Sequence, residues 1–377
     1  MIYFDNSSTT RVRKDVINKM TYIMGEEYGN PSSLHSFGFS AEKEIKKAKT
    51  IISEIIKSDK DEIFFTSGGT EANNLAVFGI VSAYKKTGTH IIVNKTEHPS
   101  VSEAYKKLEN SGYTVSYIDV DRKGYAKLAQ LEEEITDKTI LVSIMHVNNE
   151  IGTINDIKKI SEIIKNKNKK TVFHTDCVQS FCKHNINSKY ADLITLSGHK
   201  IHGPKGVGAL FIKKGIRVEP VFMGGNQQKG IRSGTENVAG IAGFAAAAEN
   251  MSSDIEKNTE KVSAVKNKLK EIKNLLPEVY INGDEGSGSP YILNMSFAHV
   301  KGEVLLHCLE DKGIYVSTGS ACMSNHKKHR GTVDVIGGNS ENSLRFSFSD
   351  ENTVDEAEEC VTALLEIVPL LRQYKQL

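Results

Sequence analysis

The stretch Leu193-Ile194-Thr195-Leu196-Ser197-Gly198-His199-Lys200 runs from a mostly apolar segment into a short polar segment that ends in a lysine, and the glycine-rich run 203–208 follows it. The apolar run predicts a buried strand, and the glycines predict a tight turn after it. An amine held beside an apolar strand loses its proton more readily than one in water, and a neutral amine can form a Schiff base. Lys200 is therefore a candidate nucleophile, although glycines near a lysine also occur in ordinary turns.

Seven apolar runs of this kind alternate with segments of helical periodicity, which is clearest over 41–57. Strands without polar alternation, separated by helices, predict an α/β fold whose mostly parallel sheet is covered on both faces. Ligands of such sheets bind at the carboxyl ends of the strands, and the polar motifs of this chain follow those ends. The seven runs are 62–66, 90–93, 115–118, 139–144, 171–174, 193–196 and 208–212.

The sequence changes character after about Gly240, where an alanine-rich helix, a charged helix over 254–273 and a Gly/Ser/Pro stretch over 283–290 follow one another. Later strands are predicted at 291–297, 313–317 and 343–349, which indicates a smaller α+β domain. We expect the first dozen residues to cross over and join it. The predicted division is a large domain over 13–250 and a small domain formed by 1–12 and 251–377.

The composition points to small-molecule or protein partners. The 377 residues include 25% charged residues with a net charge of +1, so nothing favours direct nucleic-acid binding or an anionic membrane surface. No targeting signal or membrane-spanning run is evident, which favours a cytoplasmic protein. Five scattered cysteines do not make a disulfide framework, and their odd number leaves at least one thiol that can be chemically active.

The segment Ser67-Gly68-Gly69-Thr70-Glu71 follows one predicted strand and precedes a helix. Backbone amides at Gly69 and the hydroxyl of Thr70 would then face an anion at the helix N-terminus, and a phosphate is the expected ligand. The spacing differs from a Walker A motif, and no dinucleotide glycine fingerprint is present, so ATP and NAD are disfavoured. The alternative is a capped helix after a tight turn.

Four further polar residues follow strands. Asp176 could pair with a protonated pyridine nitrogen, as pyridoxal phosphate (PLP) chemistry requires, and Gln179 could reach the ring hydroxyl. His98 could stack on a planar ring or transfer a proton, and the amide of Asn149 could hold a ring oxygen or a substrate carboxylate. Taken alone, an aspartate in this position is often a helix cap, and a lone histidine is usually structural.

These motifs together resemble the cysteine desulfurases, fold-type I PLP enzymes of the class V aminotransferase group, over essentially the whole chain. The resemblance implies Lys200 as the Schiff-base lysine, Asp176 on the pyridine nitrogen, Gln179 on the ring oxygen and His98 stacked on the ring. It implies Thr70, Ser197 and His199 as phosphate ligands. Thr235 would reach the phosphate of a neighbouring subunit, which makes the enzyme an obligate homodimer. The matching motifs are Asp5-Asn6-Ser7-Ser8-Thr9-Thr10, Gly29-Asn30-Pro31-Ser32-Ser33, Thr66-Ser67-Gly68-Gly69-Thr70-Glu71, residues 143–152, Ser197-Gly198-His199-Lys200 and Arg232-Ser233-Gly234-Thr235.

The second domain carries the part of the resemblance that separates this family from other PLP enzymes. Cys322, in Ser317-Thr318-Gly319-Ser320-Ala321-Cys322, matches the family's mobile-loop cysteine, whose thiolate attacks the substrate sulfur. Arg345 matches the arginine that binds the substrate α-carboxylate. Cys177 and Cys308 are expected to be packing residues.

Two segments depart from the family pattern. The run 323–330 after the cysteine is shorter and more basic than the family leads us to expect, and 224–229 is an altered form of a Gly-Gly-Gly-Gln-Glu-Arg-like loop. These departures put the loop's motion and the sulfur acceptor in doubt. His326 and His329 raise the alternative of a metal site, but a solvated basic loop is favoured and no metal is expected.

The sequence therefore predicts a homodimeric PLP enzyme that converts L-cysteine to L-alanine and leaves a persulfide on Cys322. The sulfur acceptor would be an iron-sulfur scaffold, a tRNA-thiolation protein or another carrier. Two alternatives stay open: a selenocysteine lyase or other class V enzyme that does not need Cys322, and a non-catalytic scaffold of a sulfur-transfer complex.

Overall fold

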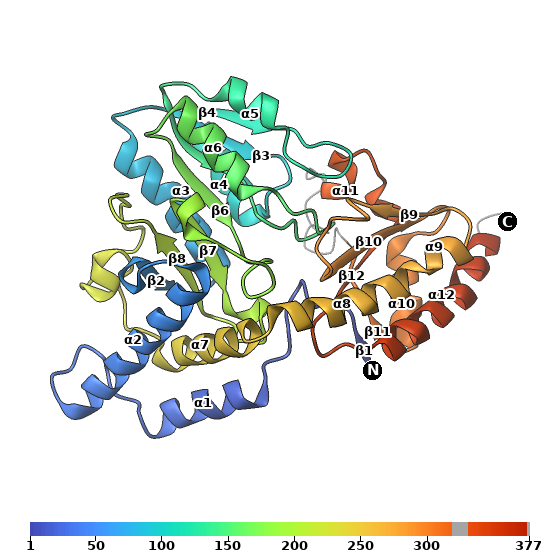
Figure 1. Ribbon diagram of the computed structural model, residues 1–377, viewed down its shortest axis with the longest axis horizontal. Coiled ribbons are helices and arrows are strands. Elements are labelled where there is room, and N and C mark those ends of the chain that lie inside the picture. Colours follow the sequence, from blue (N-terminus) through green and yellow to red (C-terminus); the bar gives the residue numbers. More distant parts are fainter. Residues whose placement is uncertain (319–330, 375–377) are drawn as a thin grey trace.

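A computed structural model describes residues 1–318 and 331–374 of the chain. All seven predicted runs form one seven-stranded sheet of order β2-β8-β7-β6-β5-β3-β4, with boundaries within two residues of those predicted (Figure 1). Strand β8 runs opposite to the other six, so its pairs with β2 and β7 are antiparallel, whereas the other four pairs in this sheet are parallel. The prediction of a mostly parallel sheet is therefore confirmed. The strands are β2 Ile63–Thr66, β3 His90–Asn94, β4 Thr114–Ile118, β5 Thr139–Ser143, β6 Val172–Asp176, β7 Leu193–Ser197 and β8 Gly208–Ile212.

Helices cover both faces of this sheet, as expected for strands without polar alternation. One face packs against apolar side chains of α3 and α4, and the other packs mainly against α2, α6 and α7. Along β6, neighbouring residues face opposite sides, since Val172 belongs to the first core and Phe173 to the second. The helices of this part are α1 Lys14–Gly25, α2 Ser36–Ile56, α3 Gly69–Tyr84, α4 Pro99–Glu109, α5 Leu128–Glu134, α6 Ile157–Lys167 and α7 Val238–Ser252.

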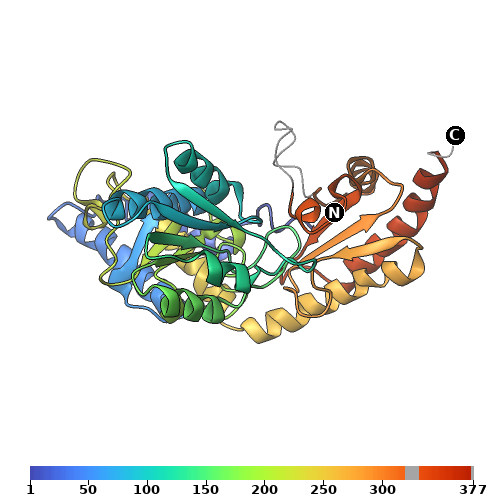
Figure 2. The ribbon, with the colours of Figure 1, turned by 90° about the horizontal axis from the view of Figure 1, so that it is seen from above.

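The C-terminal part builds a separate hydrophobic core around a three-stranded antiparallel sheet of order β12-β10-β9. Its strands are β9 Val279–Asn282, β10 Ile292–Phe297 and β12 Ser343–Ser347. Its helices are α8 Ile255–Lys270, α9 Ile272–Leu275, α10 Gly302–Asp311, α11 Thr332–Val335 and α12 Val354–Tyr374. Figure 2 shows this part beside the large sheet, with α8 extending from one to the other.

Three details of the C-terminal part differ from the sequence prediction. Strand β9 was not predicted, because it is short and two of its four residues are only partly buried. The charged helix predicted over 254–273 is divided at Glu271 into α8 and α9. The strand predicted at 313–317 forms only the two-residue β11 Ile314–Tyr315, which pairs in parallel with β1 Ile2–Tyr3, while Ser317 makes an isolated antiparallel bridge with Arg345 of β12.

The N-terminal segment lies among the C-terminal elements, as the crossover prediction requires (Figure 1). Besides the β1–β11 pair, Asp5 forms an isolated parallel bridge with Ser347 of β12. The N-terminus therefore extends the small core, and residues 5–10 run from it toward the large sheet. The domain limits at residues 12 and 250 stay a prediction. Within the described residues no helix is both long and apolar enough to cross a membrane.

Candidate active site

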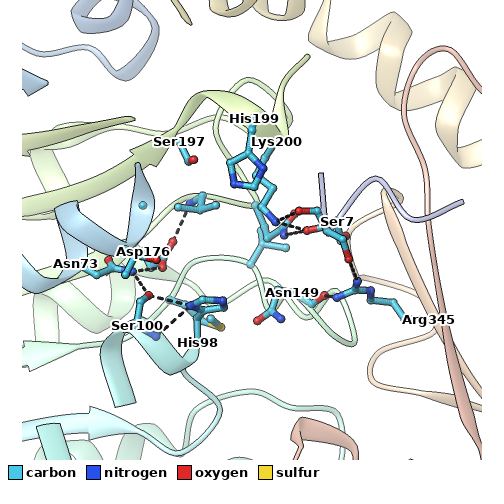
Figure 3. A pocket seen from close by; sticks show the side chains of 17 residues that line it. Ser7, Asn73, His98, Ser100, Asn149, Asp176, Ser197, His199, Lys200 and Arg345 are labelled. Carbon is cyan, nitrogen blue, oxygen red and sulfur yellow. Dashed lines mark hydrogen bonds between the residues drawn. The ribbon is translucent and has the colours of Figure 1, made fainter. Parts of the chain in front are cut away.

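A pocket of about 310 Å³ lies where the carboxyl ends of β6 and β7, the first turns of α3 and α4, the N-terminal segment and β12 meet (Figure 3). Ten of the residues predicted from the sequence to act at the site line this pocket. They are Gly69, Thr70, His98, Asn149, Asp176, Gln179, Ser197, His199, Lys200 and Arg345. These residues meet because parallel strands end at the same edge of the sheet, so residues that follow different strands lie close together there.

Asp176 is the last residue of β6 and points into the pocket, whereas its neighbours Thr175 and Cys177 line a different cavity. Both carboxylate oxygens accept hydrogen bonds: Oδ1 from the backbone N–H of Val178 at 2.8 Å, and Oδ2 from Nδ2 of Asn73 at 2.7 Å. These two donors fix the orientation of the carboxylate at the strand end.

Lys200 ends the 3-10 turn Gly198–Lys200 that follows β7, as the sequence predicts. Its Nζ donates hydrogen bonds to the backbone oxygen of Ser7 and, at 2.7 Å, to that of Ser8. Gln179 also contacts this segment, because its Nε2 donates to the same Ser7 oxygen at 3.0 Å. The N-terminal segment therefore forms one wall of the pocket and holds two of the predicted cofactor residues (Figure 3).

The first turn of α3 opens onto the pocket and onto an adjoining hollow of about 340 Å³. In the described part of the chain, no side chain caps this helix at Gly68. The structure therefore does not match the alternative of an ordinary capped helix. Gly69 needs to lack a side chain, since an added Cβ would lie 2.9 Å from Cγ2 of Val178. His199 and Lys205 also line the hollow. Burial, followed by the nearby charge of Lys200, lowers the pKa of His199 to about 4.

The residues around the pocket fit a phosphorylated pyridine cofactor. Among the described residues that line the pocket, four have a buried polar atom without a hydrogen-bond partner, and two of these atoms suit the cofactor: Oγ of Ser197, beside the α3 turn, and Oε1 of Gln179. Orphaned buried polar atoms are unusual in folded proteins, and a phosphate oxygen and a ring hydroxyl are groups that could satisfy them. The open helix N-terminus supplies further N–H donors for a phosphate.

His98 lies at the N-cap of α4, and its Nδ1 is 2.8 Å from Oγ of Ser100. Burial lowers its pKa, although the negative charge of Asp176 acts in the opposite direction. Burial therefore favours the neutral imidazole beside the pocket, in a position suited to contact a flat ring.

Arg345 lies in the middle of β12 and is 7% exposed. Its Nη1 donates to the backbone oxygen of Asn149 at 3.1 Å, while Nη2 donates to Oδ1 of Asp5 at 2.9 Å and to Oγ of Ser8 at 2.7 Å. Its Nε has no partner among the described residues. A carboxylate on the Nε–Nη2 edge would satisfy Nε and would displace Asp5 or Ser8 from Nη2.

One predicted residue is not brought to this pocket, and another lies outside the described residues. Thr235 is exposed on the surface of the large-sheet part and does not line it, so the predicted contact with a neighbouring subunit is not tested. Its loop is tied to α3 through Arg232, whose Nε is 2.8 Å from Oε1 of Glu71. Cys322 falls outside the described residues, as do His326 and His329.

The other four cysteines are accounted for by packing. Cys177, Cys182 and Cys360 are buried, and burial raises the pKa of all three thiols, that of Cys177 to about 12. Cys308 on α10 is partly buried against the C-terminal core. The expectation that Cys177 and Cys308 are packing residues agrees with these positions.

Sequence reasoning gave no role to Asp5, Ser7, Ser8 and Asn73, although each contacts a predicted site residue. The first three lie in a motif that carried the resemblance. Asn73 follows Gly69 by one helical turn, so its position on the pocket side of α3 could have been inferred from helical spacing.

Comparisons with known proteins agree with this geometry. Residues 2–360 match the aminotransferase class-V family. The chain is 40% identical to "Cysteine desulfurase IscS" of Clostridium botulinum strain Hall, over all of this chain and 96% of the relative. A solved "NIFS-LIKE PROTEIN" superposes with a TM-score of 0.93 at 35% identity, covering 98% of this chain and 99% of that one. A structure titled "SspA in complex with cysteine" has a TM-score of 0.80 at 30% identity, covering 93% and 99%. The chain therefore belongs to the class-V aminotransferase family and, within it, to the cysteine desulfurases.

Proposed function

We propose that this pocket binds PLP through Lys200, that it takes sulfur from L-cysteine with release of L-alanine, and that the sulfur passes to Cys322. The observation that carries the proposal is the meeting of three groups in one pocket: a strand-end carboxylate, a lysine amine and a buried guanidinium. The cysteine complex of the SspA protein supports cysteine as the substrate.

Different residues would bind the phosphate, the ring nitrogen, the ring oxygen and the ring face of the cofactor. The first turn of α3, with Gly69 and Thr70, and the groups of Ser197 and His199 would bind its phosphate. Asp176 would keep a proton on the pyridine nitrogen, Gln179 and Asn149 would reach the ring oxygen, and His98 would lie against the ring. When bound, the cofactor supplies an electron sink that stabilises negative charge at the substrate Cα.

The substrate would be positioned by Arg345 and Asn149. The guanidinium binds the α-carboxylate, and its burial between Asp5 and the Asn149 backbone keeps its orientation fixed. Nζ of Lys200 and Nη2 of Arg345 both contact Ser8, so a substrate carboxylate on Arg345 would place the Cα proton within reach of Nζ, which would remove it. The contacts of Nζ with the oxygens of Ser7 and Ser8 show which groups would have to release the amine for that step.

The sulfur step balances without an added oxidant. The Cys322 thiolate attacks the substrate sulfur, the S–S bond forms as the Cβ–S bond breaks, and the electron pair left on carbon takes up a proton to give L-alanine. L-cysteine and the Cys322 thiol thus become L-alanine and a Cys322 persulfide.

The quaternary structure and the partners belong to the same proposal. We infer a homodimer in which Thr235 of each subunit completes the phosphate site of the other. The exposure of Thr235 supports this, together with exposed apolar side chains on the same part of the molecule, such as Phe39 and Met223. An iron-sulfur scaffold or a tRNA-thiolation protein would take the persulfide sulfur, and the cytoplasm would be the compartment.

The test uses the full-length protein loaded with PLP and incubated briefly with L-cysteine. We expect mass spectrometry to find one added sulfur on the Cys322 peptide, together with L-alanine. Cys322→Ser should bind PLP yet form neither persulfide nor alanine, because a hydroxyl cannot accept the sulfane sulfur at neutral pH. Cys308→Ser is the matched control, since this partly buried thiol lies on α10, away from the pocket, and it should keep full activity.

The outcomes separate the alternatives. Continued alanine formation by Cys322→Ser would favour a lyase that does not need this thiol, with selenocysteine as the substrate to compare. A wild-type protein that forms no alanine at all would favour the non-catalytic scaffold.

A further inference from the structure

A chain of hydrogen bonds connects Asp176 to His98 along the floor of the pocket (Figure 3). Nδ2 of Asn73 donates to Oδ2 of Asp176 at 2.7 Å and to Oγ of Ser100 at 2.8 Å. Oγ of Ser100 lies 2.8 Å from Nδ1 of His98, and the backbone N–H of Ser100 donates to the same nitrogen at 3.2 Å. Asn73 on α3 therefore joins the strand end of β6 to the first turn of α4.

Chemistry fixes the direction of every donor in this chain. Both oxygens of Asp176 accept hydrogen bonds, so the group that Asn73 presents to it has to be the NH₂ end of the amide. One amide hydrogen goes to Asp176 and the other to Ser100. Because Oγ of Ser100 already accepts from Asn73, its own hydrogen is available for Nδ1 of His98.

Nδ1 of His98 is then an acceptor twice, from the hydroxyl and from the backbone N–H of Ser100. A neutral imidazole with an accepting Nδ1 carries its proton on Nε2. The hydroxyl is the closer of these two donors, at 2.8 Å against 3.2 Å for the backbone N–H, so the hydroxyl, whose direction Asn73 sets, contributes most to keeping Nδ1 unprotonated. The pocket therefore meets an Nε2–H donor.

The two donor contacts of Asn73 leave its own side-chain carbonyl oxygen without a partner. The residue is 1% exposed, and its Oδ1 has no hydrogen-bond partner among the described residues. Leaving a buried acceptor unpaired is unfavourable. The orientation of the amide is therefore set by the hydrogen bonds of its NH₂ group and not by a partner for its carbonyl oxygen. Asn74, its neighbour, is only partly buried, and its Nδ2 donates to the backbone oxygens of Thr70 and Ser100.

We propose that Asn73 is a positioning residue that holds His98 in the Nε2–H tautomer through Ser100 and orients Asp176 with the same amide. The kinetic consequence rests on the proposed function, but the tautomer does not. Four charged or titratable groups act on His98 or are acted on by it: Asp176, Lys200, Arg345 and His199. None of them contacts Nδ1, which the Ser100 groups occupy.

The test reads the tautomer directly by nitrogen NMR of the full-length, PLP-loaded protein labelled with ¹⁵N-histidine. His98→Gln identifies the His98 signals. We expect the wild type to show an unprotonated Nδ1 and a protonated Nε2. Asn73→Leu removes both amide hydrogens at similar volume, so the Ser100 hydroxyl can turn and accept from Nδ1, and both tautomers should be populated.

Two further variants keep the proposal falsifiable if Asn73→Leu fails to fold. Ser100→Ala should also mix the tautomers, whereas Ser100→Thr keeps the hydroxyl and should restore the wild-type pattern. Asn74→Ala is the matched control, because it removes an amide on the same helix that contacts neither Asp176 nor His98. Its signals should match those of the wild type.

The kinetic readout separates positioning from substrate binding. Asn73→Leu should lower kcat for L-cysteine by about 10- to 150-fold, as expected for losing a hydrogen bond to a charged group, with KM unchanged because Arg345 is untouched. A wild-type tautomer pattern in both Asn73→Leu and Ser100→Ala would overturn the proposal. If the wild type makes no alanine while its tautomer is as expected, the proposed function fails and the role of Asn73 in setting the tautomer stands.

Discussion

Replacing Arg345 by lysine tests whether this side chain binds the substrate carboxylate. The change keeps the positive charge but removes the planar arrangement of donors. In the structure, two different nitrogens of the guanidinium make its contacts, Nη1 with Asn149 and Nη2 with Asp5 and Ser8. A lysine has one nitrogen on a differently shaped stem, so it can keep the pairing with Asp5 but cannot also hold two parallel hydrogen bonds to a substrate.

The size of the effect follows from the number of bonds lost. One hydrogen bond to a charged group contributes about 1.5–3 kcal/mol, which corresponds to a fall in kcat/KM of about 10- to 150-fold. Because the carboxylate does not react, its binding is equal in the ground and transition states, and the loss should appear mainly as a higher KM.

The assay is the initial rate of L-alanine formation over a range of L-cysteine concentrations at saturating PLP. Arg372→Lys is the matched control: this arginine on α12 donates to the backbone oxygens of Ala298 and Glu278 and does not line the pocket. An unchanged KM in a folded, PLP-loaded Arg345→Lys protein would refute the reasoning, as would an equal rise in the control.

Three further predictions concern the same pocket. Lys200→Ala should remain folded yet lack the visible absorbance of lysine-bound PLP, because Lys200 carries the one amine among the described residues that line the pocket; a wild-type spectrum would contradict the assignment. Asp176→Asn should retain PLP but lower kcat by about 10- to 100-fold, because a neutral amide no longer keeps the ring nitrogen protonated. The NH₂ group of the new asparagine would also face the NH₂ group of Asn73. Near-normal turnover would show that another group protonates the ring nitrogen. Burial raises the pKa of Glu150 from 4.5 to about 7, against the opposite effect of Arg345. The folded protein thus favours the neutral carboxyl, so the unfolding free energy of the wild type should fall by about 1–3 kcal/mol as the pH rises from 4.5 to 7. The unfolding free energy of Glu150→Gln should not show this decrease, because its amide does not ionise. Urea denaturation at several pH values measures this difference, and parallel curves for the two proteins would show that the charge is not buried.

The sequence by itself predicts the large sheet and most of the pocket. Unbroken apolar runs locate its seven strands, and the residues that follow them, such as Asp176 and Lys200, necessarily share one edge of a parallel sheet. The glycines before Thr70 predict the proposed anion site for a local reason, since an open helix N-terminus is encoded by adjacent residues. The motif around Cys322 predicts the attacking thiol, and that prediction is still to be tested.

Only the tertiary structure decides the contacts between distant segments. Asp5 and Ser8 meet Arg345 across some 340 positions of the chain, and Ser7 meets Lys200 in the same way. Periodicity reports which face of an element is buried but not which remote element covers it, so neither the pairing of β11 with β1 nor the antiparallel direction of β8 was predicted. The role of Asn73 depends on three elements whose side chains come within hydrogen-bonding distance only after packing, which is why no local pattern in the sequence contains it.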